Sequence, residues 1–437
     1  MSHITTGNPK PHTLFFVLLA ICQCSCNDDA SSTVSENLAP NDFSLIGVPD
    51  GATEVALLPT FEWNTAMDPE SDTVTYDLIL EGNTMPSTKV ASNLTSTTYT
   101  LEMRLPISEE VRWKVIAKDN FENSTESKTN SFTTRNARIN KVSSNDNESF
   151  PSRYRHSSVV YEDKLWVMGG NKGPIIVAEF ENDIWNSTNG TNWSSVNIDA
   201  SYPPRELFPS IVFKDKIWIF GGNIFDNSLA GSNDIWTSED GVTWLENVKN
   251  AEFPPRFAHT ATIFRGEIWI IAGHSNGFKN DVWKSVDGIS WTNVTESAPF
   301  SVREFHTTVV FDDKIWIIGG LGNDFKGKND IWNSIDGINW VQVTPNANFS
   351  ARYEHSSIVY DNKIWVIGGV ENNNVYKNDV WSSTDGINWV EITGEAPFSP
   401  RISSTSVVFN DKIYLIGGSE ENINIVNGLQ NDVWTID

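Results

Sequence analysis

Six arginines recur at nearly equal spacing, and guanidinium groups in such an array could bind an anion. They are Arg153, Arg205, Arg256, Arg303, Arg352 and Arg401, separated by 52, 51, 47, 49 and 49 residues. A guanidinium group binds a carboxylate or a sulfate through two parallel hydrogen bonds, so a ring of six would suit an anionic sugar. A residue that recurs in every unit can also serve that unit, by bonding backbone groups and neighbouring acids. We favour this second interpretation for the ring as a whole.

Histidine stands three residues after four of these arginines. The four are His156, His259, His306 and His355, while Phe208 and Ser404 take this position in the other two units and His274 lies apart. We predict that the ligand-binding residues are among the six arginines and these five histidines, and the departures from the repeat are the most suggestive because function requires asymmetry. The four repeated histidines lie in different units, too far apart to share a zinc ion. We therefore expect no metal site and no cofactor.

Three carboxylates lie beside the arginines and could act in acid–base chemistry. Glu206, Glu304 and Glu354, with His274, could supply a general acid and base for sugar isomerisation or hydrolysis. Their spacing does not distinguish them from a solvated rim, so we predict no catalytic residue and expect binding without catalysis. The alternative is a carbohydrate-active enzyme such as a sugar epimerase or lyase, and a third possibility is a structural component of a surface complex.

The elements that must position these residues follow a repeat of about 50 residues. In the fifth copy we predict strands at 352–360, 363–369, 378–384 and 387–392, with a tight turn at Asp361-Asn362 and a two-residue hairpin at Asp385-Gly386. Sixteen of the 18 tryptophans fall at fixed positions on the second, third and fourth strands, where flat aromatic surface packs well. Four short strands per repeat predict the blades of a six-bladed β-propeller.

The sixth copy stops on its third strand. Residues 138–152 resemble a fourth strand and its exit loop, so we predict that this N-terminal strand completes the last blade and closes the ring. Glycine doublets recur at 169–170, 221–222, 319–320, 368–369 and 417–418. With the paired aromatics, they resemble the kelch-repeat, galactose-oxidase-like propellers. The copper-radical oxidases of that fold need a Cys–Tyr crosslink, and residues 27–437 contain no cysteine, which excludes that activity.

A second all-β unit precedes the propeller. Residues 43–135 alternate between turns and short apolar runs, with strands predicted at 61–63, 74–80, 97–101, 111–117 and 131–134. Trp63, Tyr76 and Leu105, followed by the RWKVIA strand, resemble a fibronectin type III domain, which implies a β-sandwich spacer. Asp68, Glu70 and Asp72 lie in one loop, where a Ca²⁺ site is a weaker alternative to simple solvation.

The N-terminal residues predict where the protein is located. The apolar run at 13–21 is too short to span a bilayer, which takes about 20 apolar residues, and fits a signal peptide. The following stretch, with three cysteines, resembles a bacterial lipoprotein signal. This implies lipidation at Cys26, with Cys22 and Cys24 as alternatives, and Asn27-Asp28-Asp29 resembles the export tag of surface lipoproteins. We therefore expect a bacterial outer-membrane protein exposed at the cell surface.

The charge composition and the strand order restrict the classes of partner that the protein can bind. The 437 residues include 56 acidic and 31 basic side chains, a net charge of −25, which repels phosphate backbones and excludes nucleic acid as a partner. Antiparallel strand order places the tight turns on one face of the propeller and the variable loops on the other, and binding sites favour such loops. We predict that a monomeric propeller binds a glycan or a protein ligand through this face.

From the sequence we expect an all-β chain with four parts. Residues 1–25 form a signal peptide, 26–42 a flexible tether, 43–135 the sandwich and 136–437 the propeller.

Overall fold

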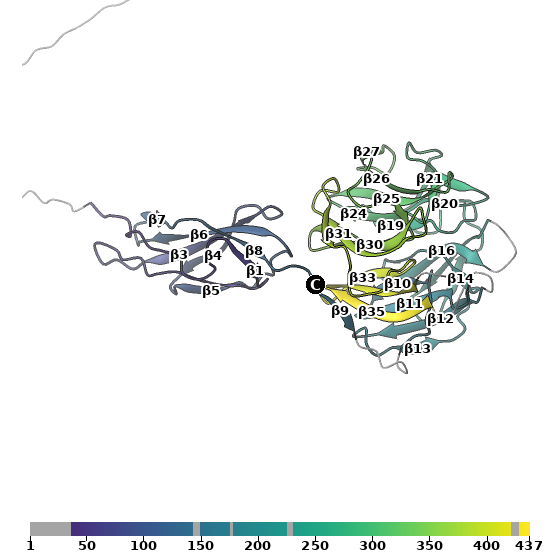
Figure 1. Cartoon of the computed structure of the whole chain (residues 1–437), viewed down its shortest axis with the longest axis horizontal. Coiled ribbons are helices and arrows are strands. Elements are labelled where there is room, and N and C mark those ends of the chain that lie inside the picture. The colour runs from purple at the N-terminus through teal and green to yellow at the C-terminus, as the bar shows by residue number, and fades with distance from the viewer. Residues whose placement is uncertain (1–35, 143–148, 175–177, 225–229, 421–427) are drawn as a thin grey trace, which may run out of the picture.

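Two β-rich units follow one another along the chain, a sandwich and a propeller (Figure 1). The computed structural model describes residues 36–142, 149–174, 178–224, 230–420 and 428–437. The predicted signal peptide and Cys26 lie outside these residues, as does most of the predicted tether. No helix in the described part of the chain is long and apolar enough to cross a membrane.

The sandwich packs two sheets around a core that contains Phe61, Trp63 and Trp113. Its strands are β1 (Ala52–Val55), β2 (Thr60–Glu62), β3 (Thr75–Gly82), β4 (Thr88–Leu94), β5 (Thr98–Thr100), β6 (Glu110–Lys118), β7 (Ser124–Glu126) and β8 (Asn130–Thr134). One sheet has the order β1-β8-β6-β3-β4, with β7 on β6, and the other pairs β2 with β5. The sequence predictions missed β1, β4 and β7, whose residues (ATEV, TKVASNL and STE) carry few apolar side chains.

The propeller has six blades, which confirms the predicted all-β propeller. Blade 1 contains β10 (Ser157–Tyr161), β11 (Lys164–Asn171), β12 (Phe180–Ser187) and β13 (Ser194–Asn197). Blade 2 contains β14 (Arg205–Glu206), β15 (Ser210–Phe213), β16 (Lys216–Ile224), β17 (Ser232–Ser238) and β18 (Leu245–Val248). Blade 3 contains β19 (Thr260–Phe264), β20 (Glu267–His274), β21 (Phe278–Ser285) and β22 (Thr292–Thr295). Blade 4 contains β23 (Arg303–Glu304), β24 (Thr307–Phe311), β25 (Lys314–Gly322), β26 (Gly327–Ser334) and β27 (Val341–Thr344). Blade 5 contains β28 (Arg352–Tyr353), β29 (Ser356–Tyr360), β30 (Lys363–Glu371), β31 (Tyr376–Ser383) and β32 (Val390–Thr393).

Blade 6 closes the ring as the sequence predicted. It contains β33 (Thr405–Phe409), β34 (Lys412–Ser419) and β35 (Leu429–Ile436), and its fourth strand is β9 (Ile139–Val142) from the start of the propeller. The antiparallel ladder runs from Ile139 opposite Ile436 to Val142 opposite Val433. The first and last blades are thereby joined without leaving an unpaired edge on β35.

Two local predictions differ from the structure. The predicted two-residue loop at Asp385-Gly386 is wrong, because β31 ends at Ser383 and its hairpin partner β32 begins only at Val390. The Ser383 hydroxyl accepts the Gly386 N–H, and the Asp385 carboxylate accepts the N–H of Ile387 and Asn388, so side chains close a wider loop. The single strand predicted at 352–360 is also wrong, because Glu354, with φ of 52°, breaks it into β28 and β29.

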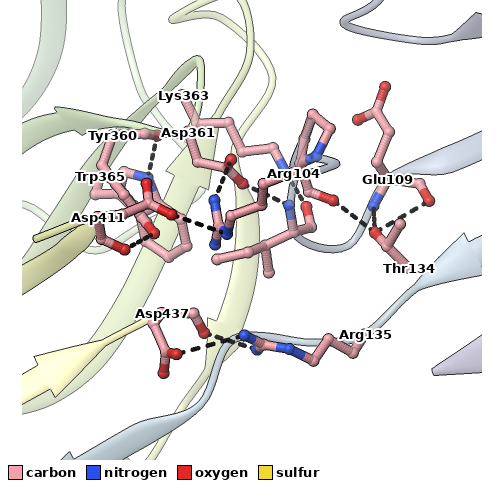
Figure 2. A network of polar contacts seen from close by, with 12 residues as sticks. Arg104, Glu109, Thr134, Arg135, Tyr360, Asp361, Lys363, Trp365, Asp411 and Asp437 are labelled. Carbon is pink, nitrogen blue, oxygen red and sulfur yellow. Dashed lines mark hydrogen bonds and ion pairs between the residues drawn. The ribbon is translucent and has the colours of Figure 1, made fainter. Parts of the chain in front are cut away.

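The sandwich is fixed to the tight-turn face of blades 5 and 6 (Figure 2). Arg104 bonds Asp361 at 2.9 Å and lies 3.3 Å from Asp411, and both aspartates lie in turns between first and second strands. Lys363 donates to the carbonyl of Ile107, whose side chain joins the apolar core of blades 5 and 6. The loop face therefore lies on the opposite side of the propeller from the sandwich (Figure 1).

Candidate functional site

The six repeated arginines lie inside the blades and are at most 1% exposed. Arg303 shows the shared pattern: Nη1 and Nη2 bond the two oxygens of Asp330 at 2.9 and 2.8 Å, and Nη1 also donates to the Gly319 carbonyl. Trp332 donates to the same carboxylate at 2.7 Å. The other pairs are Arg153–Asp183, Arg205–Asp234, Arg256–Asp281, Arg352–Asp379 and Arg401–Asp432. These contacts support the interpretation that the arginines serve their own blades, and they leave the guanidinium groups out of a ligand's reach.

Three of the four repeated histidines contact the adjacent blade across the seam between blades. Thr405, Thr260 and Thr307 each place a hydroxyl 3.0–3.2 Å from Nε2 of His156, His306 and His355, respectively. Burial, with help from the nearby arginine, lowers the pKa of these three rings to about 3, so they are neutral.

His259 differs from the other three. Neither of its ring nitrogens has a partner among the described residues. Pro209 of blade 2 stands at the position where Thr405, Thr260 and Thr307 provide their hydroxyls. Three of the repeated histidines therefore bond between blades, and the structure brings all four together in the lining of the central channel.

The channel beneath the loop face is a cavity of about 310 Å³ walled by hydroxyl groups. Serine and threonine side chains bond across the blade seams, as between Ser157 and Ser210 at 2.6 Å and between Thr307 and Ser357 at 2.7 Å. Blade 3 has Ala261 at the position of Ser210 and Ser357, so the hydroxyl contacts stop at the seam between blades 2 and 3.

A closed ring of backbone hydrogen bonds surrounds the loop-face end of this channel. The residue that breaks the first strand has φ between 50° and 57° in every blade. Its N–H donates to the carbonyl of the equivalent residue in the preceding blade, through Arg155, Leu207, Ala258, Phe305, Glu354 and Ser403 in turn. The left-handed backbone turns each N–H toward its neighbour, which fixes where these six side chains start.

One of these six side chains, Arg155, extends across the ring. Its guanidinium lies 3.4 Å from Glu206 of blade 2 and 3.2 Å from Glu354 of blade 5. It also lies 5.1 Å from the centre of the Tyr154 ring and 5.5 Å from that of Phe305 in blade 4. Although burial favours its neutral form, the two carboxylates raise its pKa, so it stays charged. Arg155 was not among the residues predicted from the sequence, although it is the one arginine at this repeat position.

A second cluster lies between blades 3 and 4. His274 Nδ1 is 3.0 Å from Glu304 Oε2, and Gly277 N–H donates to His274 Nε2 at 3.2 Å, so the neutral ring donates its proton to Glu304. Glu304 is only 7% exposed. Burial and the charge of Glu354 raise its pKa to about 7, against the opposing effect of Arg155.

Aromatic rings lead from this carboxylate to the surface. Phe257 stacks on His274 with ring centres 4.9 Å apart, Phe278 meets His274 edge-on at 5.4 Å, and Phe325 meets Phe278 at 5.8 Å. Phe325 is 76% exposed and adopts φ of 55°, a strained conformation for an aromatic residue. We call Phe257, His274, Phe278 and Phe325 the aromatic row. Of these four residues, only His274 was predicted from the sequence as a candidate ligand-binding residue.

The charge around the ring is acidic. Glu206, Glu304 and Glu354 face the single guanidinium of Arg155, while each repeated arginine is already paired with its own aspartate. This balance does not favour the anionic sugar that the arginine ring suggested. In the described residues no group of three or more His, Cys, Asp or Glu side chains is placed to hold a metal ion.

Curated proteins, a solved structure and a family model each match part of this chain. Among curated proteins, the chain is 29% identical over 129 residues to the "Leucine-zipper-like transcriptional regulator 1 homolog" of Drosophila melanogaster. It is 28% identical over 110 residues to the "tRNA wybutosine-synthesizing protein 2/3/4" of Arabidopsis thaliana. These matches cover 28% and 25% of this chain and only 13% and 11% of the relatives.

A solved structure shares the fold. The protein described as "Structure of YjhT" superposes with a TM-score of 0.53 and 14% identity, over 65% of this chain and 94% of that one. The model of the KLHDC2/KLHL20/DRC7 Kelch-repeats domain matches residues 118–320 and 243–418, which together span more than half of the chain. A kelch propeller is a scaffold for ligand binding or for catalysis. The chain belongs to this kelch-repeat family.

Proposed function

We propose that this protein is a cell-surface lipoprotein that binds a glycan through the loop face of blades 3 and 4. The observation that carries the proposal is the aromatic row, which runs from the exposed Phe325 to the buried carboxyl group of Glu304. Ring faces pack against the C–H faces of sugars, and a carboxyl group accepts hydrogen bonds from their hydroxyls.

The orientation of the two units supports a role in capture. The sandwich contacts the opposite face of the propeller, so a chain attached at its N-terminal end would present the aromatic row outward. We propose lipidation of Cys26 as that attachment. A Cys26→Ala variant is expected to leave the membrane fraction, while a Cys22→Ala variant is expected to stay in it.

The test of glycan binding uses residues 27–437 and arrays of neutral, acidic and amino polysaccharides. Phe325→Ala is expected to weaken retention several-fold, because one aromatic contact contributes about 0.5–1.5 kcal/mol beyond its buried area. Phe121→Ala is the matched control, because Phe121 is an exposed phenylalanine of the sandwich, 66% exposed. Equal retention of both variants, or no retention of any glycan by the native protein, would contradict the proposal and favour a protein ligand.

One observation favours a carbohydrate-active enzyme as the second candidate. Glu304 has a pKa of about 7 and bonds the neutral ring of His274, a pairing suited to proton transfer at neutral pH. Mass spectrometry of the incubated glycans, with NMR of the sugar protons, would detect cleavage or isomerisation. Products that disappear in Glu304→Gln, while retention persists, would establish catalysis in place of binding alone.

A further inference from the structure

We propose that the site between blades 3 and 4 selects ligands that carry a primary ammonium group, and in the glycan setting a sugar with a free amine. The inference rests on the proposed function and names its ligand class. It starts from Glu304, which is more than nine-tenths buried and has one carboxyl oxygen, Oε1, without a partner among the described residues.

Blade 2 provides an internal comparison for this free oxygen. Glu206 occupies the same repeat position as Glu304, and each receives a bond from the equivalent residue of the preceding blade, Asn171 after Gly170 or His274 after Gly273. Glu206 is also bonded by Asn223 and Arg155, which use its other oxygen. Leu321 stands opposite Glu304 where Asn223 stands opposite Glu206. Blade 4 therefore lacks both partners that satisfy the carboxylate in blade 2.

One cationic side chain of the protein itself, Arg155, is already held in this chemical way at the same end of the channel. Two carboxylates and two aromatic rings hold the guanidinium of Arg155. The rings of Phe257 and Phe278 lie around His274, which bonds Glu304, so the second cluster also offers a carboxylate and aromatic faces. No Lys or Arg in the described part of the chain forms an ion pair with Glu304. Aromatic faces attract ammonium groups, and a primary amine can also donate to the free oxygen.

The surrounding charges favour a cation. Glu354 acts on Glu304 with the same sign, Arg155 is already shared between Glu206 and Glu354, and His274 is neutral. Burial, together with the charge of Lys279, lowers the pKa of His274, and Lys279 forms no ion pair with Glu304 in the described part of the chain. A bound ammonium would stabilise the ionised form of Glu304, so binding would release a proton.

The experiment measures affinity for a glucosamine tetramer with free amines and for cellotetraose, its hydroxyl counterpart. Calorimetry at pH 7, where a carboxyl group with a pKa of about 7 is half ionised, is expected to give about fivefold or more preference for the amine, because a hydrogen bond to a charged group is typically worth 1.5–3 kcal/mol. Glu304→Gln is expected to abolish this preference. Glu391→Gln, an exposed carboxylate on β32 with the same change of charge, is expected to keep it.

A second variant tests the mechanism without touching Glu304. Leu321→Asn would supply the partner that Asn223 gives Glu206, so it is expected to reduce the preference for the amine. Equal affinity for both tetramers would overturn the ammonium inference and leave glycan binding intact. If neither tetramer bound but a lysine peptide bound in a Glu304-dependent way, the result would overturn both the amino-sugar assignment and the proposed glycan function.

Discussion

Replacing Arg303 with methionine tests whether the repeated arginines hold the blades together. The change removes a fully buried guanidinium that bonds both oxygens of Asp330, the Gly319 carbonyl, and the carbonyl and hydroxyl of Ser301. Methionine keeps much of the apolar stem but leaves the Asp330 carboxylate without its counter-ion.

The magnitude follows from that orphaned carboxylate. Removing one partner of a buried ion pair costs about 3–5 kcal/mol, and Trp332 alone cannot compensate the charge. For a domain of this size, 1 kcal/mol corresponds to roughly 2 °C, so the Tm of the propeller is expected to fall by about 6–10 °C. The double variant Arg303→Met/Asp330→Leu is expected to recover part of this loss, because no buried charge remains unpaired.

The assay is thermal unfolding followed by tryptophan fluorescence, which reports directly on the blades. Arg265→Ala is the matched control, because its ion pair with Asp313 lies on the surface, and it is expected to change the Tm little. If Arg303→Met unfolded like this control but lost ligand binding, the reasoning would be refuted, and the arginine ring would have to be assigned to the ligand.

Three further results are expected. His259→Phe should raise the free energy of unfolding by about 1 kcal/mol, because it removes buried unpaired nitrogens at a position where blade 2 has Phe208. His306→Phe should lower the free energy of unfolding, because the contact with Thr260 is lost, and urea titration of both variants measures the two effects. The pKa of Glu304 is raised to about 7 in the folded protein, so the stability that this group contributes is present below about pH 4.5 and is lost as the pH rises through 7. Glu304→Gln should remove this part of the pH dependence of the free energy of unfolding, and an unchanged pH dependence would contradict the raised pKa of Glu304. Arg104→Ala should loosen the contact between the sandwich and blades 5 and 6, seen as faster proteolysis between Arg135 and Arg138, whereas Arg112→Ala on the sandwich strand β6 should leave proteolysis unchanged.

The repeated features of this chain were predictable, and the singular ones were mostly missed. Six copies of one pattern reinforce one another, so the blades and the closing strand β9 could be predicted without an alignment. The broken first strand could not, because the backbone ring forms only between blades and a single copy shows no reason for the φ of Glu354.

The candidate site combines residues that depart from the repeat. Arg155 and Glu354 are 199 residues apart in the chain, and no local pattern relates them. His274 was singled out for its departure from the repeat, and the structure places it against Glu304. Phe208 was singled out for the same reason, but it packs in the core between blades 1 and 2. Departure from a repeat therefore selects candidates, and only the contacts between blades separate packing from chemistry.

The closing strand β9 also determines how the molecule responds to force. A short connection from Thr134 to Ile139 joins the sandwich directly to this strand, whose first residue lies opposite Ile436. A pull on the N-terminal side therefore acts along the strand axis and loads the ladder from Ile139 to Val142 in shear, after the Arg104 contacts have yielded. Ladders loaded in shear must break their bonds together, whereas ladders that are peeled lose them one at a time. The propeller is thus attached through the direction in which the ladder between β9 and β35 resists tension best.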